Sequence, residues 1–312
     1  MVGSSNHGFE TAISTKNMAN ARPSTGSGRT DGHELTASET YAACLDAVHA
    51  QNARIYGPAP EGDVWGGQAA RQFRFDPHRD PDRNLAMIAS YVRPDDVVVD
   101  VGGGAGRVCL PLAPQCREVV NVEPSPGMAA EFESLVQEAG IANARLVPSS
   151  LSDAAEIRGD ISFTADVTYF VQDITAFIRQ LEAAAGRRVM ITIWSEPPPN
   201  RRGKLFQLVY GEEQAVLPGQ RQLLPVLWDL GILPDVRVLP ESPWWENERP
   251  PTREEAVQMV LEDRWLKTED RDRARNLIES HFDELFAPSE AGFVPQWRSD
   301  MREILITWEI GA

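Results

Sequence analysis

In the segment DVVVDVGGGAGR, residues 96–107, an acid stands shortly before a run of glycines. The apolar run Val97 to Val99 leads into Asp100, and four glycines follow within the five positions 102–106. Because a glycine has no Cβ, a glycine-rich backbone can turn sharply and let a ligand come close to the main chain. The pattern predicts a buried strand that ends in a ligand-binding turn.

The spacing of the glycines separates several classes of cofactor. A dinucleotide fingerprint would need a third glycine where Arg107 stands, and a P-loop would end in Gly-Lys followed by Ser or Thr. This chain has instead the order acid-x-Gly-x-Gly-x-Gly, from Asp100 to Gly106. The order resembles the opening motif of the class I S-adenosylmethionine-dependent methyltransferases. The resemblance extends over residues 95–194 and over the segment 302–310.

The resemblance implies that the cofactor is S-adenosylmethionine, and it implies which residues surround it. Asp100 would lie near the cofactor's ammonium group, with the methionine part along Gly102, Gly103, Gly104 and Gly106. Glu123 ends the second predicted strand, where an acid accepts hydrogen bonds from both ribose hydroxyls. Met128 would lie against the adenine. The other residues implied are Pro124, Ser150, Leu151, Thr164 and Ala165, with Asp153 as a further candidate beside the adenine amino group.

Each of these assignments has a structural alternative. A glycine-rich turn also serves tight packing between a strand and a helix. Glu123 also fits a solvated strand end, and Met128 fits a core position equally well. The sequence alone leaves these alternatives open.

The class of methyl acceptor is predicted from the residues that come after the fourth predicted strand. The segment TADVTYF, residues 164–170, contains neither the Asp/Asn-Pro-Pro-aromatic motif of base-nitrogen methyltransferases nor the two-glutamate loop of arginine methyltransferases. We also find no acid cluster for a magnesium ion. The segment resembles the small-molecule and natural-product branch of the family, which implies a small organic acceptor.

Asp166 and Tyr169 are the candidates to face the transferred methyl group. Asp166 fits the N-cap of a helix at least as well, and Tyr169 fits a core position better. In-line alignment of the acceptor supplies most of the acceleration in such a reaction. A base is needed only if the acceptor must lose a proton. The candidate bases are Asp166, His78 and Asp173.

Two other functions remain open from the sequence. The first is a cofactor-binding protein that has the fold but no acceptor pocket. The second is a nucleotide-dependent oxidoreductase, against which the missing third dinucleotide glycine counts.

Composition and charge disfavour other classes, and a nucleic-acid or protein methyltransferase stays open as an alternative. The 312 residues contain 46 acids and 30 Lys or Arg, which gives a formal net charge of −16. Duplex-binding proteins present a basic face, so the charge argues against nucleic acid as a partner. No apolar run approaches the ~20 residues that cross a bilayer, and the N-terminus lacks a secretory signal. Three scattered cysteines and isolated histidines predict a cytoplasmic protein without a metal.

Apolar patterns and helix caps predict the strands and helices on which these residues lie. Strands are predicted at 97–101, 118–123, 144–150, 160–165, 188–194, 234–240 and 302–310. Helices fall between most of them; one is opened by Ser125 as N-cap and Pro126 as first residue. This alternation predicts an α/β fold with a doubly wound, Rossmann-like, seven-stranded sheet, parallel and covered on both faces.

The chain divides into three predicted parts. Residues 1–38 are rich in Ser, Gly, Thr and Asn, which predicts a disordered tail. Residues 39–94 are expected to form a mainly helical cap. The methyltransferase domain should span 95–312, with mainly helical lid insertions at about 195–222 and 241–300.

Aromatic side chains outside the sheet are expected to form a lid over the acceptor, or else to join the cap to the sheet. They come from the stretch 63–80 and from the loops after the fifth and sixth strands: Trp65, Phe73, Phe75, Phe206, Tyr210, Trp228, Trp244, Trp245 and Trp265. The segment WWENERPP, residues 244–251, could equally form a homodimer surface.

Overall fold

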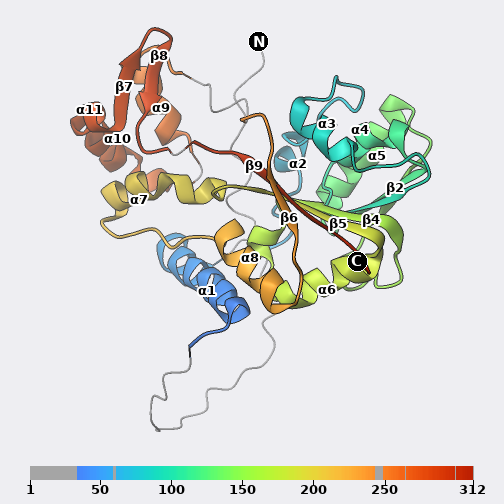
Figure 1. Ribbon diagram of the computed structural model, residues 1–312. Coiled ribbons are helices and arrows are strands. Elements are labelled where there is room, and N and C mark those ends of the chain that lie inside the picture. Colours follow the sequence, from blue (N-terminus) through green and yellow to red (C-terminus); the bar gives the residue numbers. More distant parts are fainter. Residues whose placement is uncertain (1–33, 59–60, 243–248, 264, 299, 312) are drawn as a thin grey trace.

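A seven-stranded sheet forms the centre of the molecule (Figure 1). The computed structural model describes residues 34–58, 61–242, 249–263, 265–298 and 300–311. The strand order is β3-β2-β1-β4-β5-β9-β6. The strands are β1 (Val97–Val101), β2 (Glu118–Val122), β3 (Ala144–Val147), β4 (Gly159–Ala165), β5 (Ala185–Trp194), β6 (Asp235–Val238) and β9 (Glu303–Glu309). The predicted seven-stranded α/β sheet is confirmed.

The direction of one strand, β9, differs from the expected parallel arrangement. Strands β1 to β5 pair in parallel, whereas β9 pairs antiparallel with both β5 and β6. An antiparallel strand needs no helical crossover. β9 can therefore enter the sheet directly from the late insertion that precedes it.

The strand β1 is buried along its whole length, which explains its unbroken apolar run. Val97, Val99 and Val101 face one apolar core, and Val98 faces the other. Successive side chains of a strand point to opposite faces, so one short segment contributes to both cores. This places the glycine turn at the end of the most enclosed strand.

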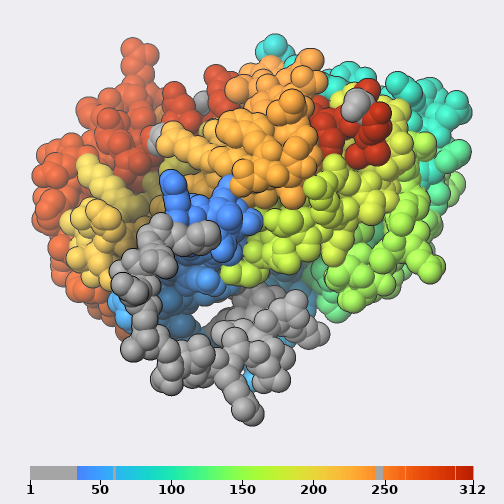
Figure 2. All heavy atoms as spheres, turned by 60° about the horizontal axis from the view of Figure 1, so that its bottom comes forward, coloured from blue at the N-terminus to red at the C-terminus, as the bar shows by residue number. Residues whose placement is uncertain are grey.

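Helices cover both faces of the sheet. One face packs against α1 (Ala37–Tyr56), α6 (Ile174–Ala184) and α8 (Gln220–Asp229). The other packs against α3 (Arg83–Ala89), α4 (Cys109–Leu112) and α5 (Pro126–Ala139). Figure 2 shows α1, in blue, beside the orange α8, and the two helices are in contact. The sheet is therefore doubly wound, as predicted.

The helices α1 and α5 begin directly after a capping residue, and for α1 this start differs from the predicted boundary of the tail. Thr36 caps α1 in a capping box with Glu39, so the helix begins at Ala37, inside the segment predicted as a tail. Residues 1–33 of that predicted tail lie outside the described residues. Ser125 caps α5, with Pro126 as its first residue, as predicted.

The helix that follows the glycine turn is short. α4 covers only Cys109–Leu112 and continues as the 3-10 turn η1 (Ala113–Gln115). Pro114 lies inside that turn and has no N–H to continue a helical ladder.

The late insertions fold around a core of their own. This lobe contains α7 (Gly203–Tyr210), α9 (Arg253–Leu261), α10 (Arg271–Ser280) and α11 (Phe282–Leu285), and it lies at the left of Figure 1. It also contains a hairpin of β7 (Phe286–Ser289) and β8 (Gly292–Pro295), which the prediction of a mainly helical insertion missed.

Candidate functional site

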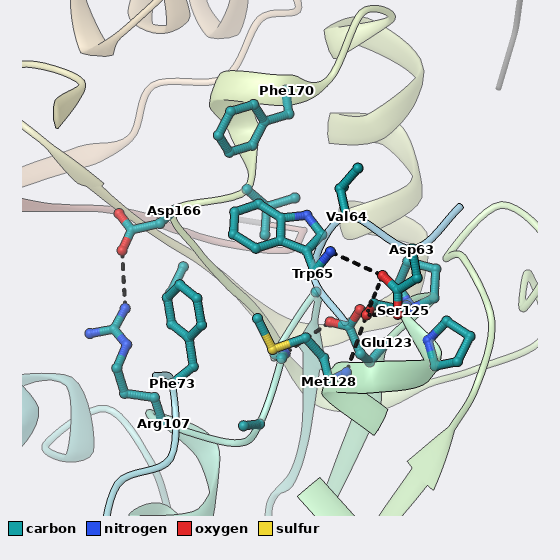
Figure 3. A pocket seen from close by; sticks show the side chains of 18 of the residues that line it. Asp63, Val64, Trp65, Phe73, Arg107, Glu123, Ser125, Met128, Asp166 and Phe170 are labelled. Atoms are coloured by element: carbon teal, nitrogen blue, oxygen red, sulfur yellow. Dashed lines mark hydrogen bonds and ion pairs between the residues drawn. The ribbon is translucent and has the colours of Figure 1, made fainter. Parts of the chain in front are cut away.

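A cavity of about 790 Å³ opens beyond the carboxyl ends of β1, β2 and β4 (Figure 3). The chain runs from β1 outward to β2 and β3 on one side, and then returns to β4 on the other side of β1. Ligands of open α/β sheets bind at such a switch point. The volume lies within the range of small-molecule sites.

The glycine turn forms the floor of this cavity through Gly102, Gly103 and Gly104. A Cβ on Gly103 would lie within 3.0 Å of the side chains of Asp100 and Asn121, so only glycine fits there. Gly106 does not line the cavity. A Cβ there would meet Leu110 and Phe132, so this glycine serves helix packing and not the cofactor contact that the resemblance implied.

Asp100 lies beneath the turn and is 1 % exposed. The pKa of its carboxyl group is raised to about 7, mainly by burial and also by the nearby Glu123, while the Cys109 thiol and Arg107 oppose the shift. Its Oδ1 atom has no hydrogen-bond partner among the described residues. A buried carboxylate oxygen without a donor fits a cationic ligand group, because such a group would satisfy it.

Glu123 follows β2 and lines the cavity from the side. Its Oε2 accepts the N–H of Gly104 at 2.9 Å, and its Oε1 accepts the N–H of Ser125 at 2.7 Å. Burial raises the pKa of Glu123, and the two backbone donors oppose this shift. Each carboxylate oxygen has a second lone pair, so this fixed group can also accept hydrogen bonds from a diol. Pro124 and Met128 line the cavity beside it.

Asp63 is a site residue that the sequence reasoning did not single out. It lies between α1 and α2 (Gln68–Arg71), far from the sheet in sequence, yet its carboxylate contacts the start of α5. Glu61, Gly62, Val64 and Ser125 line the same part of the cavity. The only sequence signal was the position of Asp63 in the stretch 63–80, expected to contribute to specificity.

Asp166 lies at the opposite side of the cavity from Asp63 (Figure 3). It is buried, and its Oδ2 pairs with Nη2 of Arg107 at 3.0 Å. Its φ of 60° is the only positive value at a non-glycine residue in the described part of the chain. Such backbone strain is often found at functional sites. Burial raises the pKa of Asp166, and the charge of Arg107 is the largest opposing effect.

Tyr169 supports Asp166 from below and does not line the cavity. Its hydroxyl donates to Oδ1 of Asp166 at 3.4 Å and accepts the N–H of Trp194 at 2.6 Å. The alternative that Asp166 caps a helix is wrong, because the residues after it form only the single 3-10 turn η2 (Thr168–Phe170). Asp173, not Asp166, caps α6, through the N–H of Ala176 at 2.9 Å.

Other predicted residues lie outside the cavity lining. The hydroxyl of Thr164 donates to the carbonyl of Val101 inside the sheet at 2.8 Å, and Leu151 is buried in a core. Ser150 bonds Ser152 and Asp153 within its own turn. His78 contacts the carbonyl of Ala139 at 2.9 Å. Ala165 does line the cavity.

The predicted aromatic lid divides into two groups. Trp65 and Phe73 line the cavity, together with Phe170. Phe206, Tyr210 and Trp265 contact one another in the core of the late insertions, so they do not cover the cavity. Trp228 is exposed and Phe75 lies outside the lining. Trp244 and Trp245, with the suggested dimer segment up to Glu248, lie outside the described residues.

Neither a membrane helix nor a metal cluster is found in the described ranges. No helix in them has the length and apolar character needed to span a bilayer. Within the same ranges, no group of three or more His, Cys, Asp or Glu side chains could hold a metal ion.

Comparison with known proteins agrees with this geometry. Residues 99–185 match a family model described as a methyltransferase domain. A curated relative, the 23S rRNA (uracil(1939)-C(5))-methyltransferase RlmD of Aeromonas salmonicida, is 47% identical over 58 residues. That match covers 19% of this chain and 13% of the relative. The RlmD protein of Xanthomonas axonopodis pv. citri is 39% identical over 74 residues, which cover 22% of this chain and 17% of that relative. The chain therefore spans less than a fifth of the length of these curated relatives.

Two solved structures are similar at low identity. The YcgJ protein of Bacillus subtilis is 14% identical, with a TM-score of 0.47, over 72% of this chain and 97% of that one. The magnesium protoporphyrin IX methyltransferase of Synechocystis PCC 6803 is 19% identical, with a TM-score of 0.42, over 64% of this chain and 93% of that one.

The family match covers the glycine turn, Glu123 and Asp166, and the sheet has the strand order described above. The chain contains a class I S-adenosylmethionine-dependent methyltransferase domain, and S-adenosylmethionine is the cofactor of that class.

Proposed function

We propose that this protein transfers a methyl group from S-adenosylmethionine to a small organic acceptor. The observation that carries the proposal is Glu123, which is fixed by two backbone N–H groups and turned into the cavity beside the glycine turn. A buried carboxylate at this strand end can bind the two ribose hydroxyls of a nucleoside. The compartment we propose is the cytoplasm, since all three cysteines are unpaired.

The charges around the cavity support this cofactor over a dinucleotide. Five carboxylate residues line it: Glu61, Asp63, Asp100, Glu123 and Asp166. Arg107 is the one cationic side chain among the described lining residues. S-adenosylmethionine has a net positive charge, whereas a dinucleotide brings a pyrophosphate that these carboxylates would repel. The charge distribution therefore disfavours the oxidoreductase alternative.

The chain's own residues would act by binding and alignment. When bound, S-adenosylmethionine supplies a methyl group on a sulfonium, which a nucleophile displaces in line while the sulfur keeps the electron pair of the broken bond. Asp100 would hold the ammonium group and Glu123 the ribose. Asp166 lines the cavity near the end of β4 and would accept a proton if the acceptor must lose one. Its support by Tyr169 and Arg107 fixes the carboxylate for that role.

The acceptor end of the cavity is apolar. Phe73, Val167 and Phe170 line it beside Trp65. These flat and branched side chains favour an acceptor with an apolar or aromatic portion next to the methylated atom.

Calorimetry with three ligands tests the proposal. We expect S-adenosylmethionine and S-adenosylhomocysteine to bind with one site per chain, and oxidised nicotinamide dinucleotide to show no heat of binding. Incubation of a cell extract with methyl-labelled cofactor should then place the label in the small-molecule fraction. Binding of the dinucleotide alone, or label only in RNA or protein, would overturn the proposal.

A further inference from the structure

The segment from Glu61 to Gly66 forms one wall of the cavity although it lies outside the sheet. Of its six residues, all but Gly66 line the cavity. We call residues 61–66 the roof segment. Figure 3 shows Asp63 directed toward Ser125 and Glu123, with Trp65 extending across the cavity toward Phe170.

Asp63 attaches the roof segment to the first turn of α5. Its two carboxylate oxygens each lie 2.9 Å from the hydroxyl of Ser125, which donates to them. Its Oδ2 also accepts the N–H of Gly127 at 2.8 Å. The first N–H groups of a helix have no partner within the helix, and a carboxylate there is stabilised by the helix dipole. Asp63 therefore uses donors that α5 leaves available.

Gly66 and Gly127 allow the backbone of the roof segment to approach the backbone of α5 closely. A Cβ on Gly127 would fall within 3.0 Å of the Cα of Gly66, a distance that real Cβ atoms do not show. The neighbouring atom belongs to the backbone, so no side-chain rotation could relieve the contact. Gly127 has no positive φ, so its glycine is required by this approach and not by backbone conformation.

The same attachment sets the position of Trp65. The Oδ1 of Asp63 accepts the N–H of Trp65 at 3.1 Å. The indole ring then contacts Phe73 edge-on at 5.8 Å between centroids, and Phe170 at 6.3 Å. Phe170 follows β4 and Phe73 follows α2. One carboxylate thus connects the adenosine side of the cavity to its aromatic side.

We propose that Asp63 is a positioning residue: by binding the start of α5 it holds the roof segment closed and places Trp65 against the acceptor-facing aromatic wall. The inference that the closed roof retains the cofactor rests on the proposed function. The attachment itself is a property of the ligand-free protein.

Three variants test the proposal in the full-length protein. Asp63→Ala removes the carboxylate, and Gly127→Ala adds only a methyl group that pushes the backbones apart. Gly140→Ala is the matched control in the same helix, because Gly140 ends α5 with a φ of 65° and has nothing within 4 Å of its added Cβ. It should lower the melting temperature without touching the roof segment.

Amide hydrogen exchange of the ligand-free protein is the first measurement. We expect residues 61–66 to exchange at least tenfold faster in Asp63→Ala and Gly127→Ala, and to exchange as in the wild type in Gly140→Ala. Unchanged exchange in both roof variants would overturn the assignment of Asp63.

The dissociation rate of S-adenosylhomocysteine is the second measurement. We expect it to rise at least tenfold in both roof variants and not in Gly140→Ala. If the wild type does not bind this ligand, the proposed function fails, while the exchange result still decides the role of Asp63. If the wild type binds it and faster exchange leaves the dissociation rate unchanged, the claim that the roof retains the cofactor is wrong.

Discussion

Asp100 and Glu123 set the electrostatics of the site at the level of single residues. Both are almost fully buried, and burial raises the pKa of each carboxyl group. Burying a carboxylate costs free energy unless donors compensate it. Glu123 has two backbone donors, whereas Asp100 retains an oxygen without a partner in the described structure. The ammonium group of a cationic nucleoside would supply a donor to this oxygen.

The change Glu123→Gln should weaken binding of S-adenosylhomocysteine at least tenfold, about 1.4 kcal/mol or more. The amide would direct an N–H₂ group toward a backbone N–H and would lose one acceptor for the ribose. Calorimetry measures the loss. Glu118→Gln, at the half-buried start of the same strand and outside the cavity lining, is the control and should bind like the wild type. Equal affinities in the two variants would contradict the role of Glu123.

Asp100 should make binding depend on pH. Its pKa of about 7 lies above the ordinary 3.8, so below pH 7 the free protein holds a proton on this group. A bound ammonium group favours the ionised carboxylate, so binding must release that proton, and affinity should rise as the pH increases toward about 8. In Asp100→Asn this part of the pH dependence should be absent. The measurement is the heat of binding at about pH 6 in two buffers of different ionisation enthalpy.

The same shift has a defined effect on stability. The unfolded chain ionises Asp100 near its ordinary pKa of 3.8, whereas the folded chain does so only near 7. Between these values the folded state binds more protons. The contribution of Asp100 to the free energy of unfolding therefore falls as the pH rises through this window, and it stays low above it. In the binding experiment described above, identical proton release by the wild type and Asp100→Asn would show that a group other than Asp100 titrates.

At the level of elements, the strand β1 and the helix α5 were predictable because their signals are local. An unbroken valine run indicates a buried strand, and Ser125 followed by Pro126 marks a helix start. The hairpin β7–β8 was missed because Pro288 and Pro295 argue against a strand. A proline is tolerated there because each hairpin strand pairs with only one other strand among the described residues.

The contact between Asp63 and Ser125 could not be predicted from sequence, since it joins residues 62 positions apart. Nothing in the local pattern around Asp63 differs from an ordinary loop acid. The class of cofactor followed from a single turn, whereas the acceptor wall combines side chains from three separate segments, around Trp65, Phe73 and Phe170. A sequence motif can therefore indicate the class of cofactor, but it cannot indicate which distant segments form the acceptor wall.

A substitution in the glycine turn, Gly103→Ala, should differ in its effect from Gly211→Ala outside the turn. Gly103→Ala would force a methyl group against Asp100 and Asn121, both buried, and should cost about 1–3 kcal/mol of stability as overpacking does. It should also weaken S-adenosylhomocysteine binding, because the turn must shift. Gly211→Ala, at the C-cap of α7 with a φ of 76°, is strained but meets nothing within 4 Å. Thermal melts and calorimetry should show that Gly211→Ala loses stability only. Wild-type affinity in Gly103→Ala would contradict the turn's role in binding.

At the level of the whole molecule, the cavity and the lobe of late insertions are built from different residues. The late insertions have their own core, in which Phe282 stacks on Phe286 at 4.7 Å and Tyr210 packs on Phe206 at 4.8 Å. None of these side chains lines the cavity. Of the aromatic side chains expected to cover the acceptor, Phe206, Tyr210 and Trp265 instead stabilise a lobe beside the sheet. We therefore expect specificity to depend on the roof segment and on the residues after β4 that line the cavity.

The net charge of the whole chain predicts a weak affinity for RNA. With a formal charge of −16, the protein should bind a 23S rRNA fragment more weakly than about 10⁻⁴ M at physiological salt, below ordinary non-specific affinity. The matches to RlmD are short: they cover 13% and 17% of those relatives, and a shared fold hosts enzymes with many acceptors. Filter binding over a range of salt concentrations measures this directly. Saturable binding whose affinity falls steeply with salt would reveal a local basic surface and would make RNA the acceptor to test first.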